Sequence, residues 1–146
     1  MGQSTNAIFF YGYVWNDEDT DLGTDDETIV ESLAKQVMPN PWDTHDKTTT
    51  WLQRHSAEVD AWYELRKEIE NGILVTIGEH CSGDYPMPYL ALKSTEVTAW
   101  RGQSRPVSLA LREDADHILV EFANDHAIDL VGAEGPGWFI ASYWSH

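Results

Sequence analysis

The sequence predicts a mixed α+β fold: residues 1–146 as a single domain, with a mostly antiparallel mixed sheet and about three helices packed on one face. The 146-residue chain is 42% hydrophobic and holds seven Trp, six Tyr and four Phe, which is enough apolar material for one core. Apolar runs suited to strands occur at both ends and in the middle of the chain. Three other stretches repeat apolar residues every three or four positions, which is typical of helices.

The first part of the chain predicts a strand and then a helix. Residues 7–15 form an unbroken apolar and aromatic run, AIFFYGYVW, which is typical of a buried strand. Thr24 and Glu27 have the spacing of a capping box, in which each side chain accepts from the other's backbone amide, so a helix is expected to begin there. Pro39 cannot continue that helix. Its apolar stripe consists of Ile29, Val30, Leu33, Ala34, Val37 and Met38.

The rest of the chain predicts a long helix, three short strands, a third helix and a final strand. Apolar residues recur at helical spacing over residues 50–71, and Gly72 suits the position after the helix end. Short strands are expected at 73–77, 89–92 and 97–100. The third helical stripe consists of Leu111, Ala115, Ile118, Leu119, Phe122 and Ala123. The last strand is expected at 137–144, after a glycine-rich loop at 132–137.

The only cysteine lies in the segment His80-Cys81-Ser82-Gly83-Asp84-Tyr85-Pro86, which is expected to connect two antiparallel strands. A nucleophilic cysteine needs a lowered pKa, a base within hydrogen-bonding distance and a group that orients the base. Cys81, His80 and Asp84 are therefore the candidate catalytic residues. Adjacent side chains point to opposite faces of a strand, however, so His80 is poorly placed to activate Cys81. The alternative interpretation is a packed cysteine beside a turn.

Charge is the extreme feature of the composition. The chain has 25 acidic and nine basic residues, a formal net charge of −16, and residues 1–34 contain eight acids and no Lys or Arg. Direct binding to nucleic acid or to an anionic membrane is excluded, because both require clustered basic residues. Fixed carboxylates can instead imitate a phosphate backbone, so the expected partner is a basic, nucleic-acid-handling protein. The expected binding residues are Asp17, Glu18, Asp19, Asp21, Asp25, Asp26 and Glu31.

The same acidic run has a partial likeness to a calcium loop. Asp17, Asp19 and Asp21 alternate as ligands do at the start of such a loop, and they are the only candidate metal ligands. Gly23 comes one position late, and Thr28 stands where a bidentate Glu is needed. One cysteine and scattered histidines lack the paired spacing of a zinc site. No metal and no cofactor are therefore expected.

The compartment is inferred from the cysteine content and the N-terminal residues. The opening MGQSTNAIFFYGYVW has no basic region, and its apolar run is too short for a membrane span. A single cysteine allows no internal disulfide, which agrees with a reducing compartment. A cytoplasmic location is expected.

Three segments, NAIFFYGYVW, HCSGDYPMPY and GWFIASYW, together resemble small uncharacterised proteins of phages and bacteria. The resemblance implies a bacterial or viral setting, in which small acidic inhibitors of host nucleic-acid enzymes are one class. It transfers no catalytic residue. The expected function is that of an acidic protein-binding module, an inhibitor or nucleic-acid mimic. The alternatives are a small enzyme with Cys81 as nucleophile, and a ligand-binding domain that uses exposed aromatics such as Trp42, Trp51 and Trp100.

Overall fold

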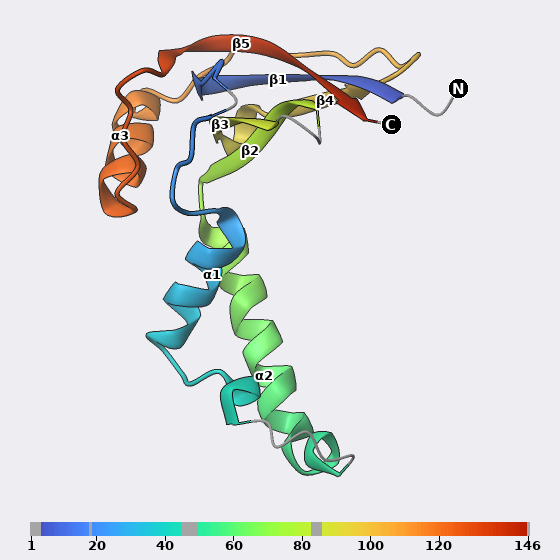
Figure 1. The fold of residues 1–146 in the computed structure, drawn as a ribbon, viewed down its shortest axis with the longest axis vertical. Coiled ribbons are helices and arrows are strands. Elements are labelled where there is room, and N and C mark those ends of the chain that lie inside the picture. Colours follow the sequence, from blue (N-terminus) through green and yellow to red (C-terminus); the bar gives the residue numbers. More distant parts are fainter. Residues whose placement is uncertain (1–3, 18, 45–49, 83–85, 146) are drawn as a thin grey trace. The chain divides into compact units, whose positions relative to one another are not determined.

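The computed structural model describes residues 4–17, 19–44, 50–82 and 86–145, and within these ranges it contains three α-helices and five strands (Figure 1). The α+β class is therefore confirmed. The chain divides into two compact units, one formed by Met1–Asp25 with Leu74–His146 and the other by Asp26–Ile73. The first unit contains the whole sheet and one helix, and the second contains two helices.

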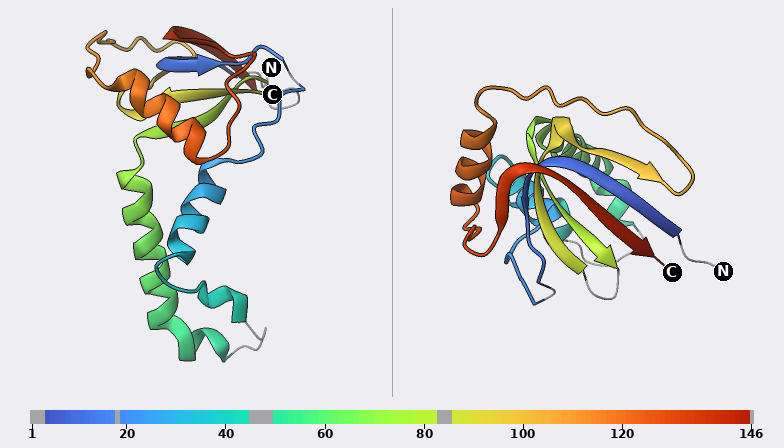
Figure 2. Two further views of the ribbon diagram at one scale, coloured as in Figure 1. Left: turned by 90° about the vertical axis from the view of Figure 1, so that its left-hand side faces the viewer. Right: turned by 90° about the horizontal axis from the view of Figure 1, so that it is seen from above.

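The five strands form one sheet in the order β3-β2-β5-β1-β4. Their bounds are β1 Ser4–Val14, β2 Val75–Ser82, β3 Pro86–Leu92, β4 Val97–Trp100 and β5 Glu134–Ser145. Every pairing is antiparallel except the short parallel one between β2 and β5, so the prediction of a mostly antiparallel mixed sheet is confirmed. Because β1 also pairs with β3, the strands β1, β3, β2 and β5 close into a ring (Figure 2).

The ring encloses the first hydrophobic cluster. Alternate residues of β1 point inward, and the register sets Phe10 opposite Phe139 of β5 and Val14 opposite Tyr89 of β3. The Phe10 and Tyr89 rings stack with their centroids 4.5 Å apart. The buried members of the cluster are Ile8, Phe10, Val14, Tyr89, Ala91 and Ala141.

Two glycines allow the ring to close tightly. A Cβ at Gly12 of β1 would collide with the backbone carbonyl of Leu90 in β3. A Cβ at Gly78 of β2 would collide with the ring of Tyr89. Glycine alone permits this approach of backbone to backbone and of ring to backbone.

A short break separates β3 from β4 along the edge of β1. The 3-10 helix η2, Lys93–Thr95, fills the break. Its Thr95 Oγ1 accepts a hydrogen bond from the backbone amide of Tyr11 at 3.0 Å and donates one to the carbonyl of Leu92 at 2.6 Å. The hydroxyl thus supplies the acceptor that the strand ladder lacks at this point.

Helix α3, Ala115–Asp125, packs against β3 and β2 in the first unit. It buries Ala115, Leu119, Phe122 and Ala123, and the strand residues Leu90 and Leu92 are also fully buried. Leu90 and Leu92 alternate with the inward-facing Tyr89 and Ala91, so they form a second apolar layer outside the ring. The predicted stripe began too early, because Leu111 precedes the helix and is exposed.

The Tyr11 side chain links β1 to α3. Its hydroxyl donates to Oδ1 of Asp116 at 2.5 Å. This hydrogen bond to a carboxylate, together with burial of the phenol, raises the pKa of Tyr11 to about 12. The pKa of Tyr13 is also raised, mainly because the phenol is buried and to a smaller extent because of the negative charge of Asp116.

The second unit contains α1 (Asp26–Lys35), the 3-10 helix η1 (Pro41–Thr44) and α2 (Trp51–Gly72). Helices α1 and α2 lie side by side (Figures 1 and 2). Their contact buries residues of the predicted stripes, including Ile29 and Val30 of α1 and Val59 and Trp62 of α2. Both helices are therefore confirmed, with boundaries close to the predicted ones.

Several local predictions are wrong. Val37 lies beyond α1 and is 69% exposed, so it is no part of the apolar stripe. Helix α1 begins at Asp26, and no hydrogen bond joins Thr24 to Glu27 among the described residues, so the capping box does not form. Strand β2 continues to Ser82 because its ladder with β3 extends to Cys81 opposite Pro86. Strand β5 already begins at Glu134, inside the predicted loop.

Candidate functional site

The acidic segment after β1 is held in two consecutive turns. Oδ1 of Asp17 accepts from the backbone amide of Asp19 at 2.9 Å, and Oδ1 of Asp21 accepts from the amide of Gly23 at 2.8 Å. These are Asx turns, in which an aspartate side chain bonds the amide two residues later. Gly23 takes a φ of 76°, which glycine adopts without strain. The acidic segment therefore has a defined backbone.

The structure also bears on the partial likeness of this segment to a calcium loop. Asp17 and Asp21 each use one carboxylate oxygen to accept a hydrogen bond from the backbone. Over the ranges that the structure describes, no group of three or more His, Cys, Asp or Glu could hold a metal ion. Asp17, Asp19 and Asp21 are thus not brought together as ligands.

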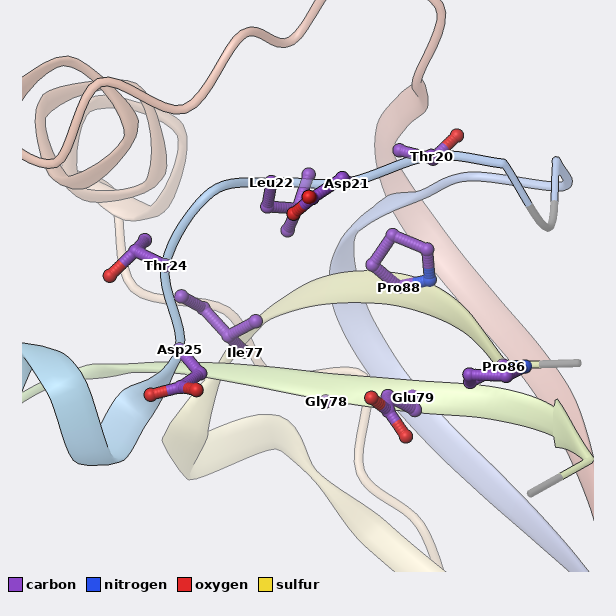
Figure 3. Close-up of a pocket in the computed structure, with 10 residues that line it drawn as sticks. All are labelled: Thr20, Asp21, Leu22, Thr24, Asp25, Ile77, Gly78, Glu79, Pro86 and Pro88. Carbon is purple, nitrogen blue, oxygen red and sulfur yellow. The ribbon is translucent and has the colours of Figure 1, made fainter. Parts of the chain in front are cut away.

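One side of the acidic segment forms a pocket of about 390 Å³ with strands β2 and β3, here named the Glu79 pocket (Figure 3). Its carboxylates are those of Asp21, Asp25 and Glu79. Ile77, Gly78, Pro86 and Pro88 of the strands complete the lining, together with Thr20, Leu22 and Thr24. Asp21 and Asp25 are among the binding residues predicted from the sequence, whereas Glu79, which comes more than 50 residues later in the chain, is not.

A second pocket, of about 410 Å³, uses the acidic segment together with the chain after α3, and is named the Asp129 pocket. Its carboxylates are those of Asp17, Asp21 and Asp129. Oδ1 of Asp129 accepts from the amide of Val131 at 2.9 Å, which makes a third Asx turn. Asp129 and Gly132 are residue types typical of turns, so a turn at this position is predictable from the sequence.

The two pockets share Thr20, Asp21 and Leu22, and among the described residues no Lys, Arg or His lines either of them. The salt bridges at Lys35, Arg112 and His117 lie elsewhere. The described lining of each pocket therefore gathers carboxylates and no basic side chain. A cationic group is the chemical complement of such a site.

The remaining predicted binding residues fall outside this cluster. Asp19 belongs to the acidic segment but lines neither pocket. Asp26 and Glu31 belong to α1 in the second unit, and Glu18 lies outside the described residues. Glu31 pairs with Lys35 at 3.6 Å and accepts from Nδ2 of Asn40 at 3.3 Å, so its charge is partly compensated. A single surface that includes all seven acids stays a prediction.

Of the predicted catalytic group, only Cys81 and His80 are described, and no hydrogen bond joins their side chains. Cys81 has a φ of 79°, and within the described ranges its thiol has no hydrogen-bond partner. His80 is 7% exposed, and its Nε2 lies 2.8 Å from the carbonyl oxygen of Trp15. Asp84 lies outside the described residues. The base that a cysteine nucleophile requires is thus not supplied by His80.

The three tryptophans considered for ligand stacking differ in exposure. Trp51 is 2% exposed, so its assignment as an exposed aromatic is wrong. It packs against Trp42 with ring centroids 5.1 Å apart and stacks on His55 at 4.5 Å. Trp100, at the end of β4, is 60% exposed. Trp42 and Trp51 belong to the second unit, and Trp100 belongs to the first.

Comparison with known protein families, with curated proteins and with solved structures finds no match to this chain. Roles for its residues consequently stand on geometry and chemistry alone. Among the helices of the described residues, none combines the length and the apolar character that crossing a bilayer needs.

Proposed function

We propose that this protein is an acidic protein-binding module whose segment 17–25 receives arginine or lysine side chains of a basic, nucleic-acid-handling partner. The observation that carries the proposal is the pair of pockets on either side of that segment, in each of which the described lining includes three carboxylates and no basic residue. Arginine suits such a site, because its planar guanidinium can bind two carboxylate oxygens at once.

The ordered backbone of the acidic segment supports binding in a second way. The Asx turns at Asp17 and Asp21 hold the carboxylates before a partner arrives. A preorganised surface loses less conformational entropy on association than a flexible acidic tail does. The net charge of −16 would also accelerate encounter with a positively charged partner.

The proposal extends to the setting of the protein. A partner that normally binds nucleic acid would be inhibited, because the carboxylates would occupy its phosphate-binding channel. The single cysteine and the resemblance to small phage and bacterial proteins favour the cytoplasm of a bacterial cell.

The test is affinity capture from a bacterial lysate at low and high salt, followed by measurement of Kd with the purified captured protein. The loop variant combines Asp17→Asn, Asp19→Asn, Asp21→Asn and Asp25→Asn. Asparagine keeps the side-chain oxygen that accepts from the Asp19 and Gly23 amides, so the turns are retained. The control variant makes the same charge change on exposed acids of α2, with Glu58→Gln, Asp60→Asn, Glu64→Gln and Glu68→Gln.

Each exposed ion pair contributes about 0.2–1 kcal/mol, so loss of four should weaken binding roughly fivefold to several-hundredfold at low salt. The difference should shrink at high salt, where surface charges are screened. The control variant should bind nearly as the parent does. Equal affinities for the loop and control variants would refute the role of the acidic segment. A captured partner whose DNA binding is unaffected by this protein would refute the mimicry alone.

A further inference from the structure

His80 occupies the inside of the strand ring in a way that leaves one nitrogen of its imidazole unused. Its Nε2 lies 2.8 Å from the carbonyl oxygen of Trp15, and a carbonyl can only accept, so Nε2 carries the proton. In the neutral ring Nδ1 is then an acceptor. Within the described part of the chain nothing hydrogen-bonds to Nδ1.

The Nδ1 atom of His80 is also not sealed from solvent. Among the described side chains, the only completely buried nitrogen or oxygen without a partner is Nε of Arg66. His80 is nevertheless 93% covered, and it lines a cavity of about 340 Å³. The imidazole is therefore a nearly buried polar group in the lining of that cavity, here named the His80 cavity.

The polar lining of the His80 cavity is rich in acceptors. Glu134, at the start of β5, lines the cavity, and its Oε1 accepts a hydrogen bond from Nδ2 of Asn16 at 3.3 Å. Among the described residues, no Lys or Arg lines the cavity and none forms a salt bridge with Glu134. The hydrogen bond from Asn16 therefore orients a carboxylate that has no basic partner among these residues.

Apolar side chains contribute part of the remaining lining. Val14, Phe139 and Ala141 belong to the core of the ring, whereas Ile140 of β5 is 74% exposed. A volume of this size lies at the lower end of the range for small-molecule sites, which combine apolar walls with a few placed polar groups. A buried acceptor, a carboxylate and apolar walls together select a ligand with a cationic donor and a hydrophobic body.

We infer that the His80 cavity binds a small primary amine with an apolar body, its ammonium group placed between Glu134 and Nδ1 of His80 and its body against Phe139. A metal ion is a poorer occupant, because the described lining offers only one histidine and one carboxylate. An anion would be repelled by Glu134. The site is separate from the acidic segment, since Asp17, Asp19, Asp21 and Asp25 do not line it.

The experiment titrates the protein with benzylamine and follows the imidazole nitrogens of His80 by NMR spectroscopy. The expected result is a saturable shift of the His80 Nδ1 resonance at millimolar benzylamine, with no comparable shift from benzoate. Glu134→Gln should weaken binding about tenfold, because it removes the charge while keeping an acceptor for Asn16. Glu121→Gln, at an exposed position of α3, is the matched control and should not change Kd.

His80→Phe should abolish saturable binding, as monitored by the NMR signals of the backbone amides that line the cavity. Circular dichroism checks that this variant keeps the fold. If that variant does not fold, the Glu134→Gln comparison still decides. The inference is overturned by the absence of a His80 response to benzylamine, by equal binding of benzoate, or by an unchanged affinity in Glu134→Gln. The four-Asn loop variant should bind benzylamine as the parent does, so this outcome is independent of the proposed function.

Discussion

Replacing Tyr11 with phenylalanine removes one hydroxyl that joins strand β1 to helix α3. Tyr11 is 8% exposed, and its hydroxyl donates to Oδ1 of Asp116 at 2.5 Å. A hydrogen bond to a charged group contributes about 1.5–3 kcal/mol, and the exposed Asp116 can be rehydrated when the hydroxyl is lost, so we expect a destabilisation of about 1–2 kcal/mol. In a domain of this size that corresponds to a fall in Tm of roughly 2–8 °C.

The pH dependence provides a second measurement on the same pair. The pKa of Tyr11 is raised from 10.0 to about 12, so the folded state favours the neutral phenol. The contribution to stability is complete below pH 10 and is lost as pH rises through about 12. Urea unfolding of the parent and of Tyr11→Phe should therefore converge across this range.

The matched control is Tyr13→Phe, two residues along β1. Tyr13 is also buried, but within the described residues its hydroxyl has no hydrogen-bond partner. This variant should change stability by less than about 0.5 kcal/mol. Equal losses in the two variants at neutral pH, or a Tyr11→Phe difference that does not depend on pH, would refute the assigned hydrogen bond.

Three further outcomes follow from the backbone and the acidic segment. Gly12→Ala should destabilise the protein by about 1–3 kcal/mol or more in urea unfolding, because the new Cβ meets the Leu90 carbonyl, whereas Gly72→Ala has open space and should be neutral or stabilising. Cys81→Gly should be more stable than Cys81→Ala by about 1 kcal/mol, since only glycine adopts a φ of 79° without strain. In the parent protein, the Cys81 thiol should react with thiol reagents no faster than a cysteine peptide does. Millimolar calcium should raise Tm no more than magnesium does, and calcium-selective binding in calorimetry that disappears in Asp17→Asn would contradict the separation of the carboxylates.

Parts of the candidate sites were predictable from the sequence because they depend on neighbours in the chain. The acidic segment was found from composition, and its turns follow from aspartates placed two residues before the amides that they accept. Glu79 and Asp129 were missed, because they reach the same segment only through sheet pairing and the position of the chain after α3. The unpaired Nδ1 of His80 was likewise invisible, since its environment depends on Trp15, 65 residues earlier in the chain.

The class of the fold and the approximate positions of its helices and strands follow from local patterns in the sequence. Periodicity is enough for this, because α2 differs from its predicted range by one residue at each end, and β4 matches the prediction. The closure of β1, β3, β2 and β5 into a ring, and the identity of the side chains that the ring buries, are evident only in the folded structure. The register between distant strands depends on packing at positions such as Gly12 and Gly78. A Cβ at these positions would collide with Leu90 and Tyr89, which lie against the two glycines only in the folded sheet.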